Sequence, residues 1–144
     1  MKAVFAPYKA RVALKELGGA IRMAASIAIQ QAGEIARAKA QSTVQYKDRT
    51  GKTRASVVFL KQGFHHGLLR SGGASHFLEE GTKPHVIRPK GSGMLHFQIA
   101  GVWISTRHVN HPGTRARPFV RAARDFGEVA LRALMMSRLR DAIR

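Results

Sequence analysis

The stretch VALKELGGAIRMAASIAIQQAGEIARAKA, residues 12–40, decides the fold because it has the apolar spacing of one long helix. Apolar residues recur along it at steps of three and four and form a single stripe. The stripe consists of Leu14, Leu17, Ile21, Ala24, Ala28 and Ile35. Gly18 and Gly19 each lower helix stability by about 1 kcal/mol relative to alanine, so we expect the helix to begin or bend there. Uninterrupted, it would span about 40 Å and would need another element to lie against.

Short segments rich in β-branched and aromatic residues follow this helix and predict strands. They are SVVFLK (56–61), HGLLRS (66–71), MLHFQI (94–99) and VWIST (102–106). In residues 94–99, polar and apolar residues alternate as in a strand with one buried face. Gly101 marks a tight turn, so segments 94–99 and 102–106 are predicted to pair as a hairpin. The stretch HFLEEGT (76–82) fits either a strand or a single helical turn.

The remaining segments predict two loops and a second helix. Residues 43–54 are polar, and residues 83–93 hold two prolines, two glycines and three basic groups, so we predict an exposed loop at 83–93. Helical spacing returns over residues 118–143, where Pro118 suits the first turn. The expected fold class is α+β in a single domain, 1–144, with the sheet region at 54–110. It has a long N-terminal helix, an antiparallel sheet of about four strands and a C-terminal helix packed on one face.

The charge of the chain is its one extreme property. Its 144 residues include 25 Lys and Arg against 8 Asp and Glu, a formal net charge of +17. The excess is spread along the chain and therefore belongs to the folded body. Such a field attracts nucleic acid, acidic protein surfaces or anionic lipid. The sequence lacks the clusters of basic residues with interleaved aromatics that are typical of nucleic-acid-binding proteins. A basic nucleic-acid-binding protein is therefore the alternative function and not the main prediction.

The composition also bounds where the protein works. The chain has no cysteine, which excludes disulfides and thiolate metal sites. No apolar run in the sequence reaches the roughly 18–20 residues that cross a bilayer. The N-terminal residues are basic throughout and lack the apolar stretch of a signal peptide. We therefore expect synthesis in the cytoplasm and no membrane partner.

No motif in the sequence has the spacing of a known reaction centre, so we expect no catalytic, cofactor or metal site. The pairs His65-His66 and His108-x-x-His111 lack the helical spacing of a zinc protease. The only acidic pair, Glu79-Glu80, cannot flank a substrate because its members are consecutive. A nuclease-like trio of Glu79, His85 and Arg88 is conceivable, which leaves a small nuclease or toxin as a lesser alternative.

Three short motifs occur in order along the chain. They are RTGKTRASV (49–57), HFLEEGTKPHVI (76–87) and HPGTRARPFVRAARD (111–125). The arrangement resembles the tail-completion, or head–tail connector, minor structural proteins of long-tailed phages and prophages. The residues that carry the resemblance are Thr50, Gly51 and Ser56, then Phe77, Glu80, Gly81 and Thr82, then Pro118, Phe119 and Ala123. Thr53 departs from the family, which usually has an aliphatic residue there.

The resemblance implies a non-enzymatic α+β subunit of the virion that assembles as a ring at the neck or tail top. Its partners would be copies of itself, portal-side connector proteins, and the tail tube or tail terminator protein. Because +17 is high for such a subunit, its basic surface would face acidic neighbours or DNA passing through the neck. The predicted interface residues are Glu80, Gly81, Thr82, Lys83, Arg88, Lys90, Arg115, Arg117, Phe119 and Arg121. The loop 83–93 is the candidate for an arm ordered by assembly.

Overall fold

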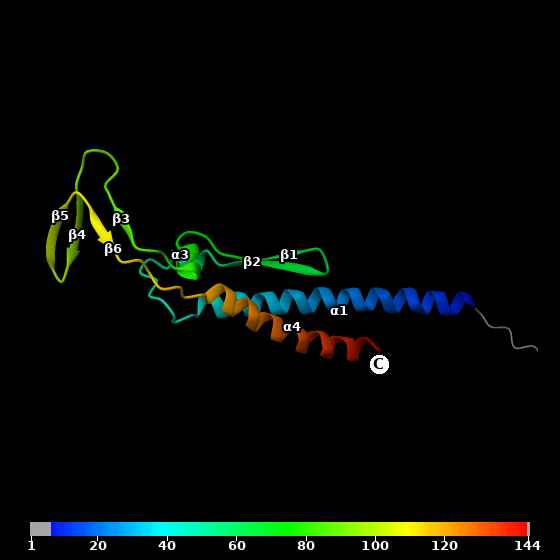
Figure 1. Cartoon of the computed structure of the whole chain (residues 1–144). Helices are drawn as coiled ribbons and strands as arrows, with labels where there is room; N and C mark the ends of the chain where they lie inside the picture. The colour runs from blue at the N-terminus through cyan, green and yellow to red at the C-terminus, as the bar shows by residue number, and fades with distance from the viewer. Residues whose placement is uncertain (1–6, 144) are drawn as a thin grey trace, which may run out of the picture. The chain divides into compact units, whose positions relative to one another are not determined.

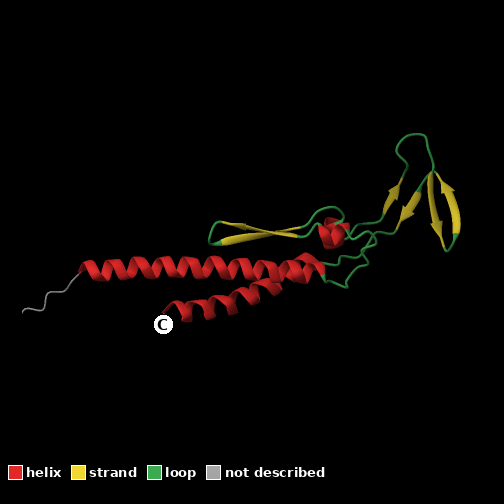
Figure 2. Cartoon of the chain, turned by 180° about the vertical axis from the view of Figure 1, so that it is seen from behind, coloured by secondary structure: helices red, strands yellow, loops and turns green. Residues whose placement is uncertain are grey.

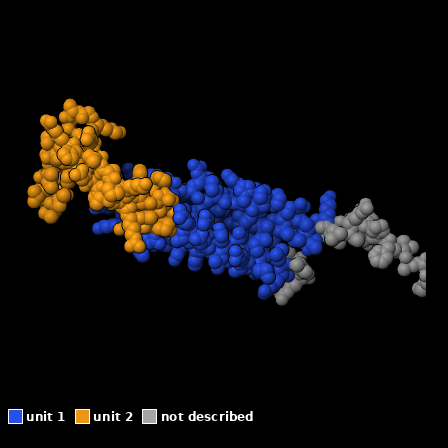
Figure 3. Space-filling view, in the orientation of Figure 1, with its two compact units in different colours: residues 1–73, 119–144 blue, residues 74–118 orange. Residues whose placement is uncertain are grey.

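A computed structural model describes the chain from residue 7 to residue 143, with side chains from residue 15 to residue 141. The protein is α+β, as the sequence predicts: a long N-terminal helix, short antiparallel strands and a C-terminal helix (Figure 1). The strands form separate two-stranded sheets (Figure 2), where the sequence predicted one sheet of about four strands. The chain divides into two compact units (Figure 3). Unit 1 joins Met1–Gly73 to Phe119–Arg144, and unit 2 is Ala74–Pro118.

Unit 1 holds the two long helices. Its elements are α1 (Pro7–Gln41), α2 (Lys52–Ala55), β1 (Val58–Gln62), β2 (His66–Arg70) and α4 (Phe119–Ile143). Helix α4 starts beside the C-terminal end of α1 and runs back along it in both cartoon views (Figures 1 and 2). The C-terminal helix therefore packs on α1. Its predicted place on a face of the sheet was wrong, because the small residues of α1 let two helices pair directly.

The α1–α4 contact is built from small residues. Helix α1 runs unbroken through Gly18 and Gly19, and it buries an alanine at every fourth position from Ala24 to Ala40. On α4, a Cβ placed at Gly127 would lie 2.7 Å from the Cβ of Ala36. The two backbones thus approach closely without large side chains between them.

The predicted apolar stripe is only partly buried. Ala24 and Ala28 are buried as expected, while the larger Leu17, Ile21 and Ile35 stay more than a third exposed. The side chain of Leu14 lies outside the described residues. Alanine, and not the larger aliphatic residues, therefore fills the contact between the helices.

The loop after α1 covers the start of α4. The buried Tyr46 ring packs against Phe119, with 4.9 Å between ring centroids. The Arg54 guanidinium lies 5.6 Å from the Tyr46 ring centroid, and its Nη2 donates a hydrogen bond to the Thr43 carbonyl oxygen at 2.7 Å. Phe119 therefore anchors α4 on this loop.

Polar contacts attach the β1–β2 hairpin to α1 and close its base. The Nε2 of Gln41 donates to the Val57 carbonyl oxygen at 3.1 Å, and Lys61 Nζ donates to the Ser26 hydroxyl. At the base, the Ser56 hydroxyl donates to the Thr53 carbonyl oxygen at 2.6 Å and accepts from the Gly72 N–H at 3.0 Å. Ser56 and Gly72 flank the two strands, so a single hydroxyl ties the hairpin ends together.

Unit 2 consists of one short helix and two strand pairs. Its elements are α3 (Ser75–Glu80), β3 (His85–Ile87), β4 (Leu95–Ile99), β5 (Val102–Thr106) and β6 (Val109–His111). Strands β4 and β5 form the predicted hairpin, with Leu95 opposite Thr106 and Ile99 opposite Val102. Residues 76–80 of the ambiguous segment 76–82 are helical in α3, and Thr82 forms an isolated β-bridge. Strand β3 lies inside the predicted loop 83–93, because it pairs with β6, a strand the sequence analysis missed.

Candidate interaction surfaces

Two Gly-Thr segments from different motifs meet in unit 2. The Thr82 N–H donates to the Thr114 carbonyl oxygen at 2.9 Å, and the Thr114 N–H donates to the Thr82 carbonyl oxygen at 3.0 Å. The pair forms an isolated antiparallel bridge between the segments after α3 and after β6. We call Gly81, Thr82, Gly113 and Thr114 the Gly-Thr bridge. It joins the second and third motifs of the sequence, although Thr82 and Thr114 are 32 positions apart in the chain.

The bridge requires its glycines. Gly81 and Gly113 have φ angles of 71° and 88°, which side chains rarely adopt. A Cβ at Gly81 would lie 2.8 Å from the Ala116 nitrogen, and one at Gly113 would lie 3.0 Å from the Lys83 carbonyl carbon. The Thr82 hydroxyl is buried and has no hydrogen-bond partner among the described residues. Gly81 and Thr82, predicted as interface residues, therefore hold unit 2 together.

The predicted charged interface residues are exposed. Glu80 ends α3, Lys83 precedes β3, and Arg88 and Lys90 follow β3. Arg115 and Arg117 follow the Gly-Thr bridge, and the Arg117 N–H donates to the Leu78 carbonyl oxygen at 2.6 Å. Unit 2 thus presents these cations around a fixed backbone crossing. Arg121, also exposed, belongs to α4 in unit 1.

Phe119 is not an exposed contact residue. Its side chain is 2% exposed and forms part of the core of unit 1. The prediction that it contributes to a partner interface was wrong, because the loop at Tyr46 folds back over it. The nearby carboxylates of Asp125 and Glu128 form ion pairs with Arg124 of the same helix. The distances are 2.8 Å from Arg124 Nη2 to Asp125 Oδ1 and 3.7 Å from Arg124 Nε to Glu128 Oε1, so α4 neutralises part of their charge itself.

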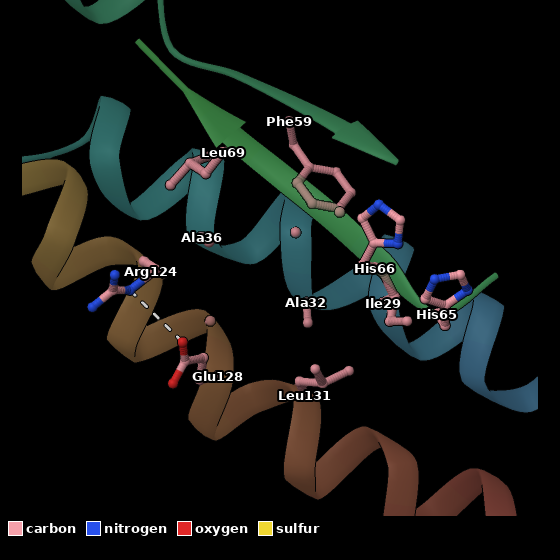
Figure 4. Close-up of a pocket in the computed structure, with 13 residues that line it drawn as sticks. Ile29, Ala32, Ala36, Phe59, His65, His66, Leu69, Arg124, Glu128 and Leu131 are labelled. Atoms are coloured by element: carbon pink, nitrogen blue, oxygen red, sulfur yellow. Dashed lines mark ion pairs between the residues drawn. The ribbon is translucent and has the colours of Figure 1, made fainter. Parts of the chain in front are cut away.

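A groove of about 310 Å³ lies in unit 1 between the β1–β2 hairpin and the two long helices (Figure 4). Small residues, including Ala32, Gly33 and Gly127, line it, and Phe59 lies in it from β1 (Figure 4). A Cβ at Gly33 would overlap the Phe59 ring. The imidazoles of His65 and His66 stand on one side, with 4.5 Å between ring centroids.

The other histidines do not gather into a larger cluster. His85 and His111 are cross-strand partners with 5.0 Å between ring centroids, and the Nδ1 of His85 lies 2.8 Å from the Lys83 carbonyl oxygen. Across the described residues, no group of three or more His, Cys, Asp or Glu side chains is arranged to hold a metal ion. The helices of the described part include none that is long and apolar enough for a membrane span.

The β4–β5 hairpin is the surface that the sequence analysis missed. Trp103, the single tryptophan of the chain, is 73% exposed on β5, and Ile99 and Val102 at the hairpin end are also exposed. The sequence signal was present: residues 91–106 contain no Lys, Arg, Asp or Glu in a chain whose residues are 23% charged. An exposed apolar hairpin without charges indicates a contact surface.

Comparison of the chain with models of protein families, with curated proteins and with solved structures finds no match.

Proposed function

We propose that this chain is a structural protein of a phage virion that acts in head–tail joining or tail completion and assembles as a ring. The proposal rests on the resemblance of its three motifs to that family and on one observation, the small core beside a large exposed apolar surface. No catalytic step is part of the proposed role. The place of action is the neck or tail of the virion.

The core of the described residues is unusually thin. Six of its nine buried hydrophobic residues are alanines, and the only large side chains that are fully buried are Val57 and Phe119, with 1% and 2% exposure. Alanine buries little apolar area, so each contributes little of the roughly 25 cal/mol per Å² that burial supplies. A chain of this size needs further burial, which subunit contacts provide.

Large apolar side chains are exposed in both units. In unit 1 they include Met23, Val129 and Met136, and in unit 2 they include Phe77 and Trp103. Single exposed apolar residues are ordinary on a monomer. Here they recur along both long helices and along the β4–β5 hairpin, as in a subunit whose faces are covered by neighbours.

The partners proposed for this subunit are copies of itself, portal-side connector proteins, and the tail tube or tail terminator protein. Head-to-tail contacts between identical subunits close into a ring when the rotation permits. The exposed cations of unit 2, Lys83, Arg88, Lys90 and Arg115, suit acidic partner surfaces or DNA passing through the neck.

The test is to mix the purified chain with the connector and tail proteins encoded beside its own gene. Light scattering after size-exclusion chromatography would give the mass of any complex, and electron microscopy would show whether it is a ring. We expect ring-shaped particles with one of these partners. A chain that stays monomeric with every one of them, or a gene neighbourhood without virion proteins, contradicts the proposal.

The alternative, a nucleic-acid-binding protein, is favoured only by the exposed cations. Its affinity for duplex DNA would fall with salt on a log–log scale, with a slope of about −0.9 for each phosphate neutralised. Fluorescence anisotropy with a labelled duplex at several salt concentrations measures that slope. Absence of binding at about 0.1 M salt eliminates this alternative.

A further inference from the structure

We propose that the β4–β5 hairpin pairs edge to edge with the same hairpin of a second copy of the chain. The inference rests on the proposed assembly into a homo-oligomer and names the contact that forms it. We call residues 94–106 the uncharged hairpin. Its outer edges are the sides of β4 and β5 that face away from each other.

Both outer edges are open. Within the part of the chain that the structure describes, β4 pairs only with β5, and neither joins a third strand. The turn at Ala100 and Gly101, with φ angles of 49° and 86°, joins the two strands directly. A two-stranded hairpin is marginally stable in water, and three or more strands are needed for independent stability.

The edges also lack the usual protection against pairing. Proteins guard exposed edge strands with lysines, prolines, bulges or inward charges. The uncharged hairpin has no proline and no charged residue, and its five cross-strand pairs run in unbroken register from Leu95–Thr106 to Ile99–Val102. A second strand therefore meets no barrier along either edge.

Both faces of the hairpin carry exposed apolar groups. Ile99 and Val102 are directly opposed on one face and are 56% and 64% exposed. Trp103 lies on the other face, opposite Gln98. Edge pairing places each of these side chains beside a neighbour of the next copy, which is how cross-strand pairs stabilise a sheet.

The distribution of charge favours a second copy of the chain as the partner of the uncharged hairpin. Two chains of +17 repel each other wherever their basic surfaces meet, so they approach most easily through a surface that carries no charge. The residues that flank the hairpin, Lys90 and Arg107, are the first charges on either side of it. A polyanion would instead be met by those cations and would leave the hairpin uncovered.

The antiparallel geometry allows the pairing to repeat. When β5 of one copy lies beside β4 of the next, the strands continue to alternate in direction, because each hairpin has one strand of each direction. This contact uses two different edges and is therefore heterologous, the kind that closes into a ring. A closed ring of such hairpins has no free edge left.

Trp103 makes the test direct, since it is the only tryptophan. Its fluorescence and the molar mass by light scattering would be followed over a concentration series of the full chain. We expect the emission of Trp103 to shift to shorter wavelength as the mass rises. Val102→Lys on β5 and Ile99→Lys on β4 should each weaken self-association about tenfold or more, because the added lysine loses its hydration against apolar groups at the contact.

The matched control is Val44→Lys, which adds the same charge at a side chain that is 93% exposed and outside the hairpin. It should associate as the wild type does, and circular dichroism should show all three variants with unchanged helix content. Oligomers in which Trp103 stays exposed, or hairpin variants that assemble like the control, overturn the pairing and leave the proposed function standing. A chain that is monomeric throughout the series also overturns it, while the proposed function is judged by the separate mixing with neck and tail proteins.

Discussion

At the scale of single residues, replacing two helical glycines by alanine should change the stability of the protein in opposite directions. A Cβ at Gly127 would lie 2.7 Å from Ala36 Cβ and 3.2 Å from the Ala32 carbonyl oxygen, whereas one at Gly19 would meet no atom within 4 Å. Gly127→Ala should therefore destabilise unit 1 by about 1–3 kcal/mol through overpacking. Gly19→Ala should stabilise α1 by about 0.5–1 kcal/mol through helix propensity. Guanidinium unfolding followed by circular dichroism measures both, and equal effects of the two changes would refute the close helix contact.

Because the Tyr46 hydroxyl is buried, we expect the free energy of unfolding to fall at alkaline pH. Burial raises the pKa of Tyr46 above its ordinary value of 10.0, and the neighbouring Asp48 carboxylate adds to the shift. The folded state therefore favours the neutral phenol, so this contribution to stability is present below pH 10 and is lost as the pH rises through the folded pKa.

Two measurements check the Tyr46 prediction. In a Tyr8→Phe background Tyr46 is the only tyrosine, and its ultraviolet titration should have a midpoint above 10. Tyr46→Phe should remove this part of the alkaline loss in thermal unfolding. A titration midpoint at or below 10 would show that the phenol is not buried.

At the scale of elements, the hydroxyl of Ser56 should control the β1–β2 hairpin. It bonds both the Thr53 carbonyl oxygen and the Gly72 N–H, so Ser56→Ala removes two contacts at the hairpin base. We expect a loss of about 0.5–1.5 kcal/mol, because hydrogen bonds that join two segments of the chain are lost at a partly exposed site. Faster hydrogen exchange in β1 and β2 would accompany the loss. Ser42→Ala, which removes one exposed hydrogen bond at the end of α1, should change stability by less than about 0.5 kcal/mol.

Elements with strong local signals could be predicted from the sequence. The apolar spacing of residues 12–40 predicts α1, and the alternation of residues 94–99 with the turn at Gly101 predicts the β4–β5 hairpin. Strands β3 and β6 could not be predicted, because three-residue strands carry almost no periodicity and exist only through pairing with each other. The single sheet was wrong for the same reason: which strands pair is a tertiary property.

The candidate surface was only partly predictable. The exposed cations follow from composition, whereas the burial of Phe119 depends on a loop that returns from a distant part of the chain. The backbone crossing at Thr82 and Thr114 is likewise nonlocal. The charge-free run of residues 91–106, by contrast, is visible in the sequence and could have identified the hairpin around Trp103.

At the scale of the whole molecule, the net charge of +17 predicts opposite salt effects for the two kinds of partner. Raising the salt from about 0.05 to about 0.5 M shortens the range of electrostatic repulsion between copies. Self-association should therefore strengthen over this range, while binding to DNA should weaken because counterion release is lost. Sedimentation velocity and anisotropy titrations in the same buffers measure the two trends. Self-association that weakens with salt would contradict a contact made through an uncharged surface.

The alanines of α1 recur every four residues, which is a displacement of about 6 Å along the helix axis. Each alanine of this row offers α4 nearly the same surface. The row by itself would therefore also allow α4 to pack one alanine further along α1. Two contacts that do not repeat along the row fix the position of α4. Gly127 fits against Ala36, and Phe119 packs against Tyr46 at the end of the row. The position of α4 along α1 is thus fixed near the start of α4. A change in the loop that holds Tyr46 would let α4 shift along the whole of its contact with α1.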